Sequence, residues 1–103
     1  MIINVDQAKL FEIVEQVFLG MDCSTDHARI AAHSLVSADL RGIDSHGVAR
    51  LSGYVRLWEA KRINARPTIR VVHETPSTAV VDGDSGLGLV VAPFAMEVAI
   101  QKA

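Results

Sequence analysis

The chain has 103 residues, half of them hydrophobic, with a formal net charge of −2 and a single cysteine. This length predicts one small domain over residues 1–103. The charge balance argues against wholesale nucleic-acid binding, and no stretch approaches the roughly 20 apolar residues of a membrane span. The lone cysteine excludes an internal disulfide or a multi-cysteine metal site, and no signal peptide is evident, so we expect a cytoplasmic protein.

The mean hydropathy of +0.27 is high for so small a domain. A chain of this length buries only about 60–68% of its unfolded surface. We therefore expect some apolar surface to be covered by a second copy of the chain or by further polypeptide.

Two helices are predicted first. The run Ile2–Val5 is a short strand or a cap, Asp6 suits a helix N-cap, and Gly20 ends that helix. The segment Ser24–Asp26 starts an alanine-rich helix that Gly42 stops. Its small side chains allow close packing along a face made of Ala28, Ala31, Leu35 and Ala38.

A third helix is predicted from Ser45 or Gly47 to about Ala60. Apolar residues spaced by three and four form one face, and a second set lies opposite. Such separation is what a site mounted on a packed helix requires. The apolar face holds Val48, Leu51, Val55 and Trp58, and the other holds His46, Arg50, Gly53, Tyr54 and Leu57.

The last part of the chain is predicted to be two strands and a helix. The strands cover 68–73 and 79–81, joined by a turn at 74–77. A second turn at 82–86 leads into the helix, with glycines supplying unusual dihedral angles. The apolar residues of this helix are Val90, Phe94 and Val98. The fold is therefore a mixed α/β (α+β) arrangement of about three helices, two strands and a further helix.

His46 is the strongest candidate for chemistry. Histidine exchanges protons near neutral pH and suits general acid/base work. Ser45 could orient a ring nitrogen or a substrate oxygen, and Gly47 permits close approach. Arg50 presents a planar guanidinium that matches carboxylates. Together these groups would suit a 2-hydroxy or 2-oxo acid. The residues alone leave a plain structural role open, in which Ser45 is a cap and His46 a half-buried polar residue.

The other titratable residues point to no site. His27, His33 and His73 form no i, i+4 pair typical of a helical metal site, so no metal is expected. Cys23 has no obvious activating neighbour, and we expect no reactive thiol. The glycine-rich segment 83–91 fails the nucleophile-elbow and dinucleotide patterns.

A basic stripe occupies the middle of the chain. Residues 41–70 hold seven basic and two acidic residues, whereas the remainder holds three basic and ten acidic ones. The stripe could attract an anionic small molecule, nucleic-acid phosphate or an acidic surface, or could simply be a solvated face.

Two other functions remain open at this point. Three helices followed by a hairpin are also the order of a winged-helix DNA-binding domain. Against that interpretation, the third helix begins with Asp-Ser-His-Gly rather than with base-reading residues. A pure oligomerisation module would explain the apolar excess but would leave His46 and Arg50 without a role.

The segment around His46 resembles a known family. The similarity is to the N-terminal part of the malate/L-lactate dehydrogenase family, a non-Rossmann group that includes ureidoglycolate, sulfolactate and diketogulonate oxidoreductases. It covers essentially the whole chain, and the string Gly-Ile-Asp-Ser-His-Gly is specific. The matching segments are 38–48, Arg50-Leu51, Tyr54-Val55, 81–84, 86–88 and Ala95-Met96.

The resemblance implies an NAD(P)-dependent oxidoreductase acting on a small 2-hydroxy acid and its 2-oxo partner. His46 would donate a proton to the carbonyl during reduction and accept it in reverse. Ser45 and Arg50 match family positions near the substrate, and Tyr54 is added from its place on the helix.

Family members are much longer, and their segments that bind NAD or NADP lie beyond residue 103. We therefore expect an N-terminal fragment of a larger domain, in which no cofactor-binding residue is assigned. This fragment is expected to be inactive alone, and the full-length enzyme is expected to be a homodimer.

Overall fold

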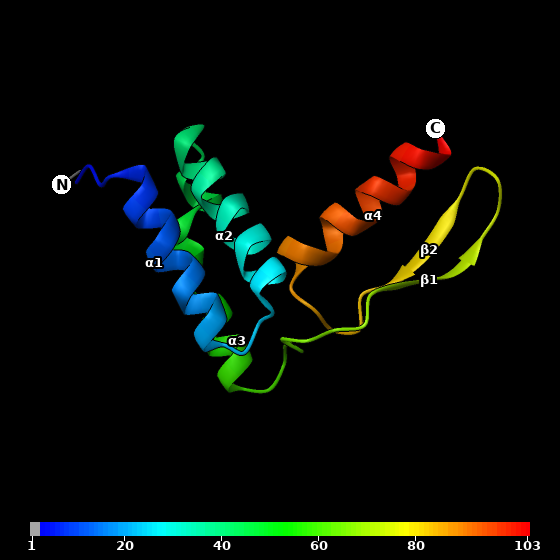
Figure 1. Cartoon of the computed structure of the whole chain (residues 1–103), viewed down its shortest axis with the longest axis horizontal. Coiled ribbons are helices and arrows are strands. Elements are labelled where there is room, and N and C mark those ends of the chain that lie inside the picture. The colour runs from blue at the N-terminus through cyan, green and yellow to red at the C-terminus, as the bar shows by residue number, and fades with distance from the viewer. Residues whose placement is uncertain (1–2) are drawn as a thin grey trace.

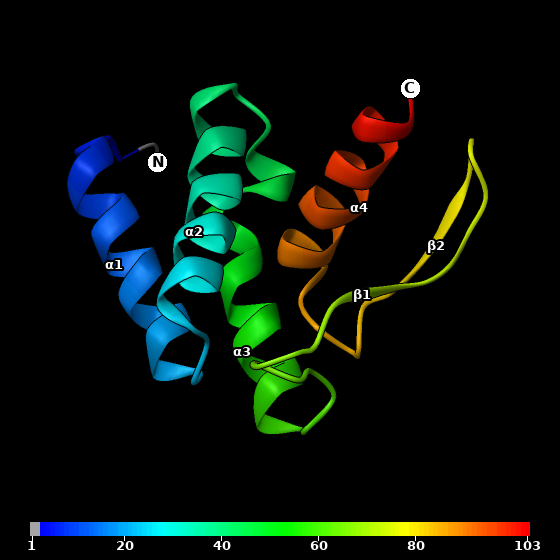
Figure 2. The same ribbon diagram turned by 45° about the vertical axis from the view of Figure 1, so that its right-hand side comes forward.

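The computed structural model describes residues 3–103, which form four α-helices and one two-stranded antiparallel sheet. The helices α1, α2 and α3 pack together, and α4 lies between this group and the β1–β2 hairpin (Figures 1 and 2). The molecule is elongated, with extents of 50 × 30 × 21 Å. The elements are α1 (Gln7–Gly20), α2 (Thr25–Leu40), the 3-10 turns η1 (Asp44–His46) and η2 (Val48–Arg50), α3 (Leu51–Glu59), β1 (Arg70–Glu74), β2 (Ala79–Asp82) and α4 (Gly88–Lys102).

The N-cap predicted at Asp6 is confirmed, and the helix start predicted at Ser24–Asp26 is capped by Ser24. The Asp6 carboxylate accepts from the Lys9 amide at 3.1 Å, and the Ser24 hydroxyl accepts from the His27 amide at 3.2 Å. Each satisfies an amide that the first helical turn leaves without a partner. Of the predicted run Ile2–Val5, Ile2 lies outside the described residues, and residues 3–5 form no regular secondary structure.

The first three helices end in the same way. After α2, Gly42 adopts φ +75°, its amide bonds to Asp39 O at 3.0 Å, and the next amide bonds to Ala38 O at 2.8 Å. This is the Schellman pattern, which favours glycine at the left-handed position. Gly42 therefore ends α2 as predicted. Gly20 is the last residue of α1, but the left-handed residue there is Asp22, and Lys61 fills that position after α3.

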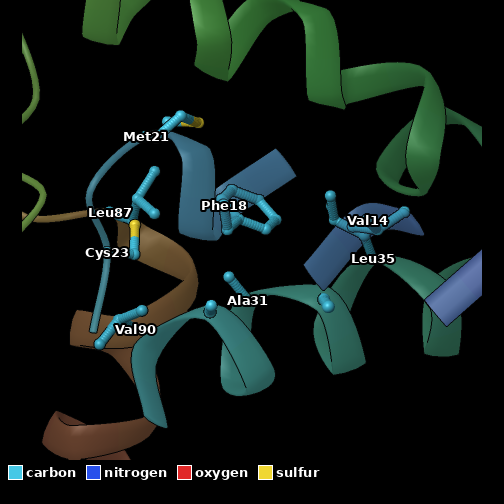
Figure 3. Packing of buried hydrophobic residues seen from close by; sticks show 10 residues of the cluster. Val14, Phe18, Met21, Cys23, Ala31, Leu35, Leu87 and Val90 are labelled. Carbon is cyan, nitrogen blue, oxygen red and sulfur yellow. The ribbon is translucent and has the colours of Figure 1, made fainter. Parts of the chain in front are cut away.

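The core lies where α1, α2 and the start of α4 meet (Figure 3). Phe18 and Leu35 have no exposed surface, and Leu87 and Val90 bring the start of α4 against Cys23. Ala31 is fully buried as predicted, and so are Ala28 and Leu35, which lets α1 and α2 approach closely. Ala38, predicted on the same face, is only half-buried.

The predicted third helix starts later than expected. Two 3-10 turns occupy residues 44–50, and the α-helix begins at Leu51. His46 and Arg50 are therefore carried by turns rather than by an α-helical face. The predicted apolar residues still face inward, because Val48, Leu51, Val55 and Trp58 all pack against the core.

The β1–β2 hairpin is confirmed with small shifts in its bounds. Val71 pairs with Val81 and His73 pairs with Val80, so an irregularity falls at Val72. The turn is closed by Thr75, whose amide bonds to Thr78 O at 2.9 Å. Lys102 joins α4 to this turn, since its ammonium donates to Thr75 O at 2.8 Å and lies 3.1 Å from Glu74.

The turn after β2 corrects one prediction. Its unusual dihedral angles belong to Asp84 (φ 53°) and Ser85 (φ 59°), not to glycines. The glycines instead permit close packing, because a Cβ at Gly83 would lie 2.9 Å from Val91 and one at Gly86 would lie 2.7 Å from Pro67.

The apolar excess predicted from composition is most evident on α4 and the hairpin. These elements expose Val72, Val80, Phe94, Met96 and Ile100. Within residues 3–103, no helix combines the length and apolar character needed to cross a membrane.

Candidate active site

Gly47 links the two turns that carry the candidate residues. His46 ends η1 and Arg50 ends η2, so the two side chains leave the backbone on either side of Gly47. Gly47 is buried, and the close approach expected at this position is made by Asp39 of α2. The Asp39 carboxylate lies so near that a Cβ on Gly47 would collide with its Oδ1.

Ser45 connects the histidine and the arginine. Its hydroxyl lies 2.8 Å from His46 Nδ1, and its main-chain oxygen accepts from Arg50 Nε at 2.6 Å. The structure therefore brings together three of the residues predicted from sequence. Since Nδ1 is engaged by Ser45, Nε2 is the His46 nitrogen available to a ligand, and it has no hydrogen-bond partner among residues 3–103.

A cleft of about 690 Å³ opens beside this network. It is bounded by α2, the turns, α3 and the start of α4, which lie next to one another in Figure 2. His46, Arg50 and Tyr54 line it, whereas Ser45 reaches it only through its two hydrogen bonds. Tyr54 also packs on the core, with its ring centroid 6.4 Å from that of Phe18.

The cleft has a positive lining. Besides Arg50, the wall contains Arg56 and Arg62, and no carboxylate lines it within the described chain. Neither Arg56 nor Arg62 forms an ion pair with any residue of 3–103. An anion entering this cleft would therefore meet arginines that are not already neutralised by protein carboxylates.

The basic stripe predicted from sequence is divided between two environments. Arg66 lies 3.3 Å from Asp22 and Arg70 lies 4.0 Å from Asp82, both pairs being exposed. Arg56 and Arg62, which sequence reasoning had not singled out, face the cleft instead. Nothing in their spacing distinguished them from the paired arginines, because which arginines face the cleft depends on how the chain packs in three dimensions.

The remaining titratable residues lie outside this cleft. His33 is near Ser37 on the exposed side of α2, and His73 is in β1. In the part of the chain that the structure describes, no group of three histidine, cysteine or acidic residues could hold a metal. Burial raises the pKa of the Cys23 thiol, and the Asp22 carboxylate adds to the rise.

Comparison with known proteins decides the family. A model of the malate/L-lactate dehydrogenase family matches residues 5–103. The chain belongs to the malate/L-lactate dehydrogenase family. It is 45% identical over 101 residues to a malate dehydrogenase of Pyrococcus horikoshii, and 49% identical over 78 residues to an L-sulfolactate dehydrogenase of Methanocaldococcus jannaschii.

Solved structures of this family share the fold. The malate dehydrogenase of Pyrococcus horikoshii superimposes with a TM-score of 0.93 at 44% identity, covering 98% of this chain. The sulfolactate dehydrogenase of Methanocaldococcus jannaschii gives 0.92 at 39% identity, covering 96% of this chain. The resemblance seen in the sequence and the mixed α/β fold are thereby confirmed.

The chain spans only part of these malate/L-lactate dehydrogenase relatives. It covers 28% of the Pyrococcus horikoshii sequence and 29% of that protein's structure. These relatives are dehydrogenases of malate and sulfolactate, and another is a ureidoglycolate dehydrogenase of Escherichia coli. The family match gives no support to the winged-helix interpretation.

Proposed function

We propose that residues 1–103 supply the proton-transfer and substrate-carboxylate side of an NAD(P)-dependent oxidoreductase for a small 2-hydroxy acid and its 2-oxo partner. The observation that carries this proposal is Ser45, which holds His46 and Arg50 together at one cleft. Membership of a dehydrogenase family supports the reaction class.

His46 is the proposed acid/base. Its Nδ1 is fixed by the Ser45 hydroxyl, so Nε2 gives a proton to the substrate carbonyl oxygen during reduction and removes it from the hydroxyl during oxidation. Histidine suits both directions because its ordinary pKa lies near neutrality. A histidine fixed through one nitrogen loses less freedom when substrate binds.

Arg50 is the proposed carboxylate anchor, with Tyr54 beside it on the cleft wall. The Arg50 Nε is engaged by the Ser45 main-chain oxygen, which leaves its terminal nitrogens for the substrate. A guanidinium grips a carboxylate through two parallel hydrogen bonds, and this grip would present the adjacent oxygen to His46. Arg56 and Arg62 would attract the anion into the cleft.

The cofactor is NAD or NADP in this proposal. Gly53 lines the cleft and a Cβ built on it meets nothing within 4 Å, so the wall there leaves room for a flat ring. Gly53 and the apolar Leu89, which also lines the cleft, would pack against the nicotinamide. When bound, nicotinamide supplies or accepts the hydride. The phosphates and adenosine of the dinucleotide would be bound by polypeptide outside these residues. The 103-residue chain alone would therefore not turn over substrate.

The assembly and location are part of the same proposal. We expect a homodimer. The exposed apolar residues of α4 and the hairpin would be covered by the second copy or by further polypeptide. A single buried thiol suits a reducing compartment, the cytoplasm.

The test uses the protein translated from the whole reading frame that contains this sequence. NADH or NADPH oxidation with small 2-oxo acids should be measured for the wild type and for His46→Ala, with His33→Ala as the control on an exposed face. We expect His46→Ala to lose about 10²- to 10⁴-fold in kcat while nicotinamide affinity is kept. An unchanged kcat in His46→Ala would refute the acid/base assignment.

A second measurement does not depend on turnover. In the 103-residue chain, L-malate should shift the NMR signals of the His46 ring, and Arg50→Gln should abolish the shift. If malate leaves His46 unaffected while the chain is folded by circular dichroism, the substrate-binding proposal for this half is wrong.

A further inference from the structure

Asp39 occupies an unfavourable place for an acidic residue. It lies in the last turn of α2 (Thr25–Leu40), where the helix dipole is negative and the turn itself holds no basic residue, the nearest being the C-cap Arg41. It is half-buried, so part of its hydration is lost as well. Local helix stability therefore does not explain an aspartate here.

Its carboxylate is bonded to the turn that carries the site. Oδ2 accepts from the Val48 amide at 3.0 Å, nine residues further along the chain. Val48 is the first residue of η2, whose last residue is Arg50. Asp39 thus satisfies the start of this turn from a neighbouring element, as an N-cap side chain does from within a helix.

The same carboxylate packs on Gly47. A Cβ on Gly47 would collide with Oδ1 and Cγ of Asp39, so no side chain can occupy this position. Gly47 follows His46 directly, so the contact fixes the backbone immediately beyond the histidine. The Asp39 carboxylate therefore contacts the backbone directly after His46 and the first residue of the turn that ends at Arg50.

The part of α2 that precedes Asp39 is well buried. Leu35, one turn earlier on α2, has no exposed surface, and Val36 is 4% exposed. We infer that Asp39 is a positioning residue, which sets His46 and Arg50 relative to the cleft by bonding Val48 and packing on Gly47. This inference rests on the proposed function, because the effect is expressed through those two residues.

The first experiment compares Asp39→Ala and Asp39→Asn in the full-length enzyme, with Asp26→Asn as the matched control. Asp26 is exposed in the first turn of the same helix, so its change removes the same charge away from the site. We expect Asp39→Ala to lose on the order of 100-fold in kcat/KM for the 2-oxo acid, the loss typical of a displacement near 1 Å. Asp39→Asn keeps an acceptor for the Val48 amide, so its kcat/KM should lie much closer to that of the wild type.

Nicotinamide affinity and the melting temperature should be measured on the same variants. A residue that only stabilises the fold would lower the melting temperature and leave kcat/KM normal well below it. Normal kcat/KM in Asp39→Ala at such temperatures would overturn the inference. If His46→Ala were also fully active, the proposed function would fail as well; if His46→Ala is inactive and Asp39→Ala is normal, only the positioning role fails.

A double-mutant cycle tests the contact with Gly47 directly. Gly47→Ala should impair the enzyme because its methyl group meets the carboxylate. In the Asp39→Ala background, where Cγ and both oxygens are gone, the same methyl should cost much less. Equal costs of Gly47→Ala in the two backgrounds would show that the carboxylate does not hold this turn.

Discussion

The hydroxyl of Ser45 lies 2.8 Å from Nδ1 of His46, while the main-chain oxygen of the same serine accepts from Arg50. The two contacts use different atoms, so they can be separated by mutation. Removing the hydroxyl releases the imidazole and leaves the arginine contact in place.

Ser45→Ala should therefore affect kcat more than KM. A net hydrogen bond is worth about 0.5–1.5 kcal/mol, which corresponds to roughly a 2- to 10-fold loss in kcat. KM for the 2-oxo acid should change little, because Arg50 keeps its partner. Ser52→Ala, in an exposed serine that does not line the cleft, is the control. A rise in KM with unchanged kcat would contradict this division of roles.

Arg50 should show the opposite pattern. Loss of a charged hydrogen-bond partner is worth about 1.5–3 kcal/mol, so Arg50→Gln should lower kcat/KM by about 10- to 100-fold, chiefly through KM. Arg50→Lys should recover only part of the loss, because an ammonium cannot form two parallel bonds. Steady-state kinetics over a series of 2-oxo acids measures both.

Two other arginines provide controls for Arg50. Arg41→Gln, exposed and away from the cleft, should be silent. Arg62→Gln should raise KM modestly, and its effect should vanish at high ionic strength because it acts only through screened attraction. If Arg62→Gln matched Arg50→Gln at high salt, Arg50 would not be the specific anchor.

Local signals predicted the parts of the fold that depend on neighbouring residues. Asp6 and Ser24 cap helices through amides three residues away, and Gly42 accepts the left-handed angle after α2. The start of α3 could not be found in this way. Residues 44–50 form 3-10 turns whose second turn is capped by Asp39, nine residues earlier, so the local helical pattern was overridden by a tertiary contact.

In the candidate site, too, local features were predictable and tertiary contacts were not. Ser45, His46 and Arg50 were predicted as functional residues from their types and spacing. The structure joins them by hydrogen bonds beside one cleft. The predicted α-helical face for His46 was wrong, since the histidine is on a turn. Asp39 could have been noticed as an acid in a last helical turn, but its bond to Val48 needs the packing of η2 against α2.

A prediction about stability follows from the end of α3. Lys61 has φ 60°, an angle that favours glycine over a residue with a Cβ. Lys61→Gly should raise the free energy of unfolding by about 1 kcal/mol, whereas Lys61→Ala keeps the Cβ and should give no such gain. Urea unfolding of the three proteins measures the difference. Equal gains for glycine and alanine would mean that loss of the charge, not the backbone angle, is responsible.

The Cys23 thiol should make stability fall at alkaline pH. The side chain is 3% exposed, and burial first, then the Asp22 carboxylate, raises its pKa, while Arg66 opposes the rise. The unfolded thiol ionises near pH 8.5, so above that pH the folded state binds more protons than the unfolded state. This contribution is fully present below about pH 8.5 and is lost as the pH rises through the raised pKa of the folded thiol.

Cys23→Ala isolates that contribution. Urea unfolding between pH 7 and pH 10 should show the wild type losing stability with a steeper slope than Cys23→Ala, although the variant starts lower because a buried side chain is truncated. Comparing the two slopes cancels every pH effect that both proteins share. Alkylation by iodoacetamide at pH 8 should be slow in the native chain and fast in urea, since the thiolate is the reactive form. Rapid native alkylation would show that the thiol is accessible and ionised.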